Sequence, residues 1–291
     1  MDSIAKGFEE LIHTFVAWAQ GQEDIHLAFV LGSRARTDHP ADEWSDLDLV
    51  TITKDARPYL ERADWVDNIG KAWLTFIETN DGSMERRVLF DGGLDVDFAF
   101  IPLETFQTML INKVDLAIAD IFRRGVRVLL DKDNQLPDSS KFSSAWKAPL
   151  PPSEAEFLQV VHDFWYHAVW TAKHLRRGEL WWGKSCCDGW LKSLLQQILE
   201  WHARATRGPG HDTWLRGRFL EEWADPRVVA QLSGAFAHYD PADIWHALAV
   251  TMDLFRMVSL ETAGLLGYSY PTDGAEYATG LVNRLSQGEE L

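Results

Sequence analysis

The sequence predicts an α+β protein in which an N-terminal α/β domain with a mixed sheet is followed by a C-terminal all-helical bundle. Short apolar or alternating runs mark strands in the first part, whereas apolar residues recur every three to four positions in the second. A segment rich in proline, serine and aspartate, residues 131–154, separates the two patterns. We therefore expect one domain at 1–135 and another at 153–291, since 291 residues suffice for two hydrophobic cores.

The first domain opens with an amphipathic helix over residues 4–20, whose apolar residues share one face. A strand follows in HLAFVL, which ends at Gly32-Ser33, and another in SDLDLVTIT, where polar and apolar residues alternate. RRVLF and LDVDFAFIP flank Asp91-Gly92-Gly93, a sequence that tolerates the positive φ of a tight turn and so predicts a β-hairpin. Together these runs predict a sheet of four or five strands.

The second domain begins at Ser153, a residue type that caps helix N-termini. Helices are expected over residues 154–177, 184–205, 215–224, 226–236 and 241–267. On the first of them the predicted core face consists of Phe157, Val161, Phe164, Ala168, Ala172 and Leu175. The opposite face mixes aromatic and ionisable residues, which we expect to line a cleft: Asp163, Tyr166, His167, Trp170, Lys173 and His174.

Charge and composition exclude several classes of protein. The 28 basic and 44 acidic residues give a net charge of −16, which argues against a nucleic-acid partner bound through its phosphates. No apolar run is long enough to span a membrane and no signal peptide is recognisable, so we expect a cytoplasmic protein without a membrane partner.

The adjacent Cys186 and Cys187 are expected to be buried thiols, and most of the 14 tryptophans to be core residues. No histidine is assigned to a metal. Acidic charge suits a polycationic small molecule, although it could serve solubility alone.

Gly32-Ser33 is the first part of a chemical motif. It ends one strand and can open a helix, so its backbone N–H groups and the Ser33 hydroxyl could face an anion. The pair therefore predicts a seat for phosphate.

Three aspartates form the second part of the motif. Asp46 and Asp48 are two residues apart on a predicted strand, so both carboxylates should project from one face. Two such close charges suit Mg²⁺, which takes carboxylate and phosphate oxygens; the alternative is a solvated strand face. Asp97, on another strand, could supply a third carboxylate. Asp95, two residues earlier in the same strand, would project from the same face and could be the ligand instead.

This motif resembles the signature of the nucleotidyltransferase superfamily typified by DNA polymerase β. More narrowly, WSDLDLV, VDFAFIP, the helical segment AKHLRRGELWWGKSCCDGWLKSLLQQILEWHAR and YSYP at 268–271 resemble the aminoglycoside (streptomycin) 6-adenylyltransferase family. The resemblance covers most of the chain. It favours Asp97 over Asp95, because the family's third carboxylate precedes an apolar stretch that leads to Ile-Pro.

The resemblance implies transfer of AMP from ATP to a hydroxyl of a cationic aminoglycoside, with streptomycin the favoured acceptor. Pyrophosphate would be released and antibiotic resistance would result. Asp46, Asp48 and Asp97 would be the catalytic acids and the ligands of two Mg²⁺ ions, with Asp97 alternatively the base. Residues 1–135 would then be the catalytic domain, and the helical domain would bind nucleotide and substrate in a monomer or weak dimer.

The remaining implied site residues lie in both domains. Gly32 and Ser33 would seat the nucleotide phosphates, which Lys173, or secondarily Lys184, would also contact. The acceptor would meet Asp163, Trp170 and Asp188, each of which could instead be an ordinary helix residue. Two rival functions are a nucleotidyltransferase that modifies tRNA or a protein and a non-catalytic nucleotide-binding regulator. The acidic charge weighs against the tRNA acceptor, and the complete set of acids against the regulator.

Overall fold

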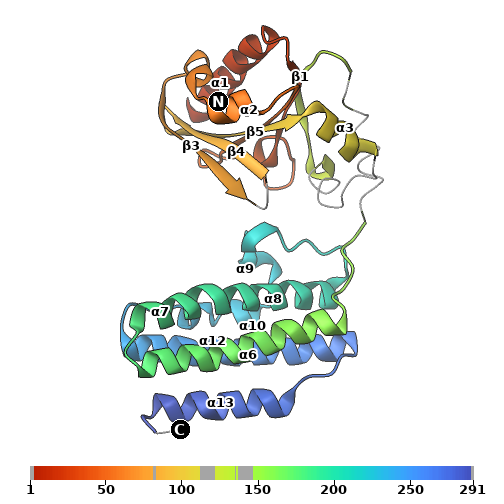
Figure 1. Ribbon diagram of the computed structural model, residues 1–291. Coiled ribbons are helices and arrows are strands. Elements are labelled where there is room, and N and C mark those ends of the chain that lie inside the picture. Colours follow the sequence, from red (N-terminus) through yellow and green to blue (C-terminus); the bar gives the residue numbers. More distant parts are fainter. Residues whose placement is uncertain (1–2, 81–82, 112–121, 135, 137–146, 290–291) are drawn as a thin grey trace. The chain divides into compact units, whose positions relative to one another are not determined.

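The computed structural model describes residues 3–80, 83–111, 122–134, 136 and 147–289 and divides the chain into two compact units, Met1–Lys147 and Ala148–Leu291 (Figure 1). The first unit is α/β with a mixed sheet and the second is helical, which confirms the predicted fold class. None of the described helices is long and apolar enough to cross a bilayer.

The first unit is built on a six-stranded sheet in the order β3-β4-β5-β2-β1-β6. Only β2 and β5 pair in parallel; the other neighbours are antiparallel. The strands are β1 (Ile25–Leu31), β2 (Leu47–Thr53), β3 (Ala72–Asn80), β4 (Ser83–Phe90), β5 (Leu94–Pro102) and β6 (Arg127–Asp131). The described helices of this unit are α1 (Ser3–Gln20), α2 (Arg57–Glu61) and α3 (Leu103–Ile111), with 3₁₀ turns at Gly32–Arg34 and Asp64–Asn68.

The hairpin of β4 and β5 around Asp91-Gly92-Gly93 was predicted correctly, but the predicted sheet was too small. The strands β3 and β6 lie at its two edges and escaped prediction. In β3 several apolar side chains point to solvent, so the sequence lacks the alternation of a half-buried strand. Strand β6 has only five residues, too few for a recognisable alternation of polar and apolar side chains.

The two faces of the sheet have different cover. Phe8, Ile12 and Phe15 of α1, with Trp65 of the second 3₁₀ turn, pack on the main hydrophobic core of one face. Over part of the other face lies a smaller cluster that includes Phe106 of α3. The remaining part of this second face carries polar side chains at the ends of β2 and β5.

The helical unit contains α6 (Glu154–Arg176), α7 (Leu180–Ser185), a π-helical segment (Cys186–Trp190), α8 (Leu191–Arg207), a 3₁₀ turn (Leu215–Gly217), α9 (Leu220–Trp223), α10 (Pro226–Val229), α11 (Leu232–Ala235), α12 (Pro241–Leu266) and α13 (Thr272–Ser286). Ser153 caps α6 with a capping box to Glu156, and the predicted core face of α6 is buried. The predicted helix over 184–205 is divided by the π-helical segment, and those over 215–224 and 226–236 are short pieces. Helix α13 was not predicted.

Both cysteines are free and buried, as expected. Most of the described tryptophans lie in or against a hydrophobic core, as expected. Trp65, Trp165 and Trp223 are buried, and five more are partly buried and pack on a core: Trp18, Trp170, Trp201, Trp214 and Trp245. The other five are exposed: Trp44, Trp73, Trp181, Trp182 and Trp190. Large aromatic surface is therefore available on both units.

Candidate active site

Gly32 directly follows β1 and lies against the side chain of Asp48, a predicted catalytic acid. Its φ of +67° is in the left-handed region, and a Cβ atom at this position would lie 2.0 Å from Asp48 Oδ2. Only glycine adopts this φ without strain and also leaves room for the Asp48 carboxylate. The neighbouring Ser33 has a buried Oγ with no hydrogen-bond partner among the described residues. An unpaired buried hydroxyl is costly unless a ligand atom completes it.

Three carboxylates meet beside this turn. Asp48 on β2 and Asp97 on β5 are direct partners of the parallel register, so their side chains share one face. Asp46 lies one residue before β2 begins, not within the strand as predicted. Oxygen atoms of Asp46, Asp48 and Asp97 nevertheless all lie within 4.8 Å of one another. Asp95 does not belong to this group.

Asp97 is the most buried of the three acids, with 9% of its surface exposed. Burial raises the pKa of its carboxyl to about 7, and the charges of Asp48 and Asp46 act in the same direction. Arg87 on β4 opposes this rise, since its Nη2 lies 3.0 Å from Asp97 Oδ2. The same guanidinium reaches Glu78 on β3, with 2.7 Å between Nε and Oε2. Sequence reasoning missed Arg87 because the register of β4 against β5 is visible only in the fold.

Arg34 is a second supporting residue that the sequence did not reveal. Its Nε donates to the Asp46 carbonyl oxygen at 2.9 Å and its Nη2 to the Ser45 carbonyl at 2.6 Å. The guanidinium also lies 3.6 Å from the centre of the Phe8 ring of α1. Arg34 therefore fixes the backbone that carries Asp46 onto the first helix.

The donor set fits a divalent cation such as Mg²⁺. Carboxylate oxygens are its preferred protein ligands, and three of them converge from two strands and one loop. Their mutual repulsion, which adds to the effect of burial on the pKa of Asp97, would be relieved by a bound cation. The Ser33 hydroxyl beside them can donate to a phosphate oxygen.

In the helical unit, Trp170 and Lys173 lie on α6 beside a groove of about 330 Å³. The other side of the groove is lined by residues of α13, including Tyr277, and by Pro271 just before this helix. The Lys173 side chain is exposed, and its ammonium group forms no hydrogen bond or ion pair with the described residues. This arrangement leaves its ammonium group available to an anion.

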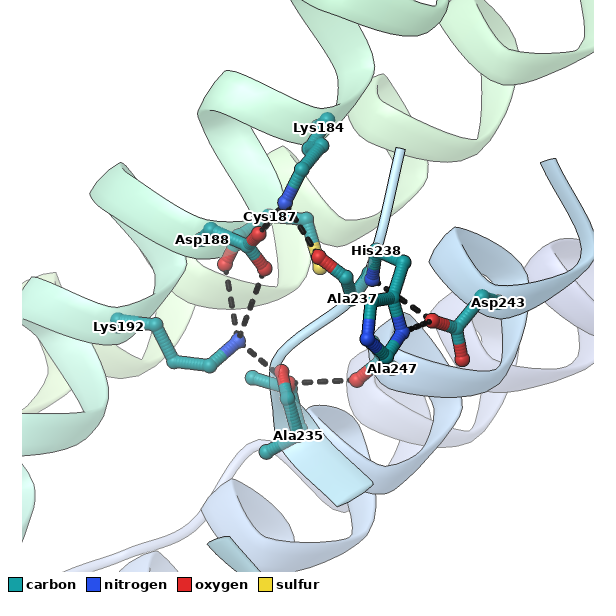
Figure 2. A network of polar contacts seen from close by, with 10 residues as sticks. Lys184, Cys187, Asp188, Lys192, Ala235, Ala237, His238, Asp243 and Ala247 are labelled. Carbon is teal, nitrogen blue, oxygen red and sulfur yellow. Dashed lines mark hydrogen bonds and ion pairs between the residues drawn. The ribbon is translucent and has the colours of Figure 1, made fainter. Parts of the chain in front are cut away.

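Lys184 and Asp188 are brought together elsewhere in this unit (Figure 2). The Lys184 ammonium donates to Asp188 Oδ2 and, at 2.6 Å, to the Ala237 carbonyl. Lys192, mostly buried, donates to the Cys187 carbonyl at 3.0 Å and to Thr251 Oγ1 at 2.8 Å, and burial lowers its pKa. The structure thus places Lys184 and Asp188 in an internal network around the π-helical segment.

Asp163, another predicted site residue of the helical unit, contacts two neighbouring side chains. His167 Nδ1 lies 2.6 Å from its Oδ1, and Trp190 Nε1 donates to the same oxygen at 3.0 Å. The mixed face of α6 predicted from the sequence therefore borders two sets of neighbours, with Trp190 near Asp163 and α13 near Trp170 and Lys173.

A further group, His202, Asp225 and Glu261, also has potential ligand atoms within 4.8 Å of one another. Arg227 contacts both carboxylates, with Nη2 2.7 Å from Asp225 Oδ2 and 2.7 Å from Glu261 Oε2. Because Arg227 already forms ion pairs with both carboxylates, we interpret the group as an ion-pair network and assign it no metal.

Comparison with known proteins adds independent observations. The model of the family described as streptomycin adenylyltransferase matches residues 6–285. An aminoglycoside 6-adenylyltransferase of Bacillus subtilis is 21% identical over 281 residues, covering 90% of this chain and 92% of that protein. That of Staphylococcus aureus is 23% identical over 273 residues, covering 90% and 93%. A crystal structure of an aminoglycoside 6-adenyltransferase from Bacillus subtilis aligns over 96% of this chain and 97% of its own, with 18% identity and a TM-score of 0.45.

Proposed function

Because the chain belongs to the streptomycin adenylyltransferase family, we propose that it transfers AMP from ATP to a hydroxyl of a cationic aminoglycoside and releases pyrophosphate. The observation that carries this proposal is the convergence of Asp46, Asp48 and Asp97 beside the Gly32-Ser33 turn. Such a set can hold a metal ion and a triphosphate on one face of a sheet.

In this reaction Asp46 and Asp48 would hold Mg²⁺, and Asp97 could be a ligand of a second ion. Such an ion would supply positive charge to offset that of the triphosphate. Gly32 leaves room for Asp48, and the Ser33 hydroxyl donates to a phosphate oxygen. Asp97, held in place by Arg87, can alternatively accept the proton of the attacking hydroxyl.

Ligand contacts are also proposed for residues of the helical unit. Lys173, whose ammonium group has no partner among the described residues, would contact the nucleotide phosphates, and Trp170 and Asp163 would contact the acceptor. Lys184 and Asp188 could reach ligands only by giving up contacts with each other, so we assign them a secondary role.

We propose streptomycin as the acceptor and antibiotic resistance as the consequence. The names of the relatives and the charge of −16, which favours a cationic acceptor, support this choice. The enzyme would act as a monomer or weak dimer in the cytoplasm, where ATP is available.

The proposal is tested by pyrophosphate release from ATP and Mg²⁺ with streptomycin, spectinomycin, kanamycin or no acceptor. We expect release with streptomycin and a loss of at least about 100-fold in the Asp48→Asn variant, because the metal loses a charged ligand. Asp95→Asn, at a neighbouring acid outside the cluster, is the matched control. Absence of release with every aminoglycoside would refute the proposed acceptor class.

A further inference from the structure

The row of site residues continues across the sheet to its open edge. The register pairs Asp48 with Asp97, Asp97 with Arg87 and Arg87 with Phe76, so these four side chains share one face over four strands. Strands lie about 4.8 Å apart, which places Phe76 on β3 roughly 10 Å from Asp97 on β5. The edge strand is therefore an extension of the candidate active site.

This extension carries exposed apolar side chains. Phe76 is 55% exposed and Leu74, two residues before it on the same face, is 65% exposed. They belong to β3, which lies at the edge of the sheet beside β4 (Figure 1). A ring and an isobutyl group on an open strand form a flat apolar surface suited to the C–H face of a sugar ring.

Acidic side chains surround this surface. Glu78 on β3 and Glu85 on β4 are direct register partners, and like charges in such positions repel. Arg87 contacts Glu78 but forms no ion pair with Glu85. The Glu85 carboxylate has no hydrogen bond or ion pair with the described residues. The described side chains that carry a charge on this face of β3, β4 and β5 are thus four acids and one base. The acids are Glu78, Glu85, Asp95 and Asp97, and the base is Arg87.

We propose that Leu74, Phe76, Glu78 and Glu85, here called the β3–β4 platform, bind the distal ring of the cationic aminoglycoside acceptor. This inference rests on the proposed function and adds to it a binding surface in the N-terminal unit. Phe76 packs against the sugar ring, and Glu85 accepts hydrogen bonds from an ammonium or guanidinium group. An acceptor of several linked rings can span the roughly 10 Å from this platform to Asp97 and present a hydroxyl there.

The test measures streptomycin binding by calorimetry without nucleotide, and steady-state kinetics with ATP and Mg²⁺. Phe76→Ala and Glu85→Gln should each raise the Kd and the KM for streptomycin roughly fivefold to tenfold, with the KM for ATP unchanged and kcat altered less than twofold. Phe76→Tyr keeps the ring and should restore wild-type affinity. Met84→Ala truncates another exposed apolar side chain of this hairpin, on the opposite face, and should resemble wild type.

Each outcome decides the inference. Equal streptomycin affinity in the wild type and Phe76→Ala would overturn it, and adenylylated product would show that the proposed function still stands. A lower Tm of Phe76→Ala without a change in affinity would also overturn it, since Phe76 would then be a packing residue. Affinity that depends on Phe76 without any adenylyl transfer would support the platform and refute the proposed function. No binding of streptomycin to the wild type would overturn the platform.

Discussion

At the scale of single residues, the position of Asp48 depends on the absence of a side chain at Gly32. A methyl group there would lie 2.0 Å from Asp48 Oδ2, and the φ of +67° adds backbone strain. We expect Gly32→Ala to lower kcat/KM by about 100-fold, because a displacement of about 1 Å in a reacting group has this order of effect. Pyrophosphate release measures the loss.

Gly93→Ala provides the control for backbone strain alone. Gly93 has a similar φ of +76°, but a Cβ atom there meets nothing within 4 Å. If both variants lost activity equally, the contact with Asp48 would not be the cause. Stability measurements should show a comparable cost of about 1 kcal/mol for both.

Asp97 should make stability depend on pH when metal is removed with EDTA. Its pKa is about 7 in the fold, against an ordinary value of 3.8, so the native state holds a proton that the unfolded state loses between about pH 4 and 7. Over this range the contribution of Asp97 lowers the free energy of unfolding as pH rises. Asp97→Asn, which stays neutral, should therefore be more stable than wild type at pH 8, by on the order of 1–3 kcal/mol, and similar to it near pH 4.

Urea unfolding of both proteins at the two pH values measures this difference. A variant less stable than wild type at pH 8 would mean that the ion pair with Arg87 outweighs the burial of the Asp97 charge. Asp95→Asn, which alters an exposed acid of the same strand, should show no comparable gain.

Among the helices and strands, those with a strong local sequence pattern were predicted well, whereas the edge strands β3 and β6 were not predicted. The helix over 154–176 was predicted because its apolar period and its Ser153 cap agree, and β4–β5 because the turn chemistry marks the hairpin. Strand β3 was missed because Phe76 and Leu74 face solvent. The pairing of Asp46 with Asp48 could be predicted from spacing, and the choice of Asp97 over Asp95 from the resemblance to the family. The roles of Arg87 and Arg34 depend on cross-strand register and loop packing.

The capping box of α6 should contribute measurably to the stability of the helical unit. Ser153 Oγ accepts a hydrogen bond from the Glu156 N–H at 3.2 Å, and the Ser153 N–H donates to Glu156 Oε2 at 2.7 Å. Ser153→Ala removes the first bond and should cost about 1 kcal/mol in the free energy of unfolding. Ser153→Thr retains the hydroxyl, so urea titrations in which both variants lose equal stability would contradict this role.

At the scale of the whole molecule, the net charge of −16 should affect the two substrates differently. Raising the salt concentration from 50 to 300 mM screens attraction of a cationic acceptor, so its KM should rise severalfold. The KM for the anionic Mg-ATP complex should stay constant or fall, because screening weakens repulsion. Parallel increases in both KM values would contradict an electrostatic origin.

We propose that the cluster of Asp46, Asp48 and Asp97 carries out adenylyl transfer to an aminoglycoside. Mass spectrometry of streptomycin incubated with the protein, ATP and Mg²⁺ tests this claim most directly. We expect an AMP adduct of streptomycin with the wild type and with Asp95→Asn, and none with Asp48→Asn. Unmodified streptomycin with the wild type, or an adduct formed equally by Asp48→Asn, would contradict it.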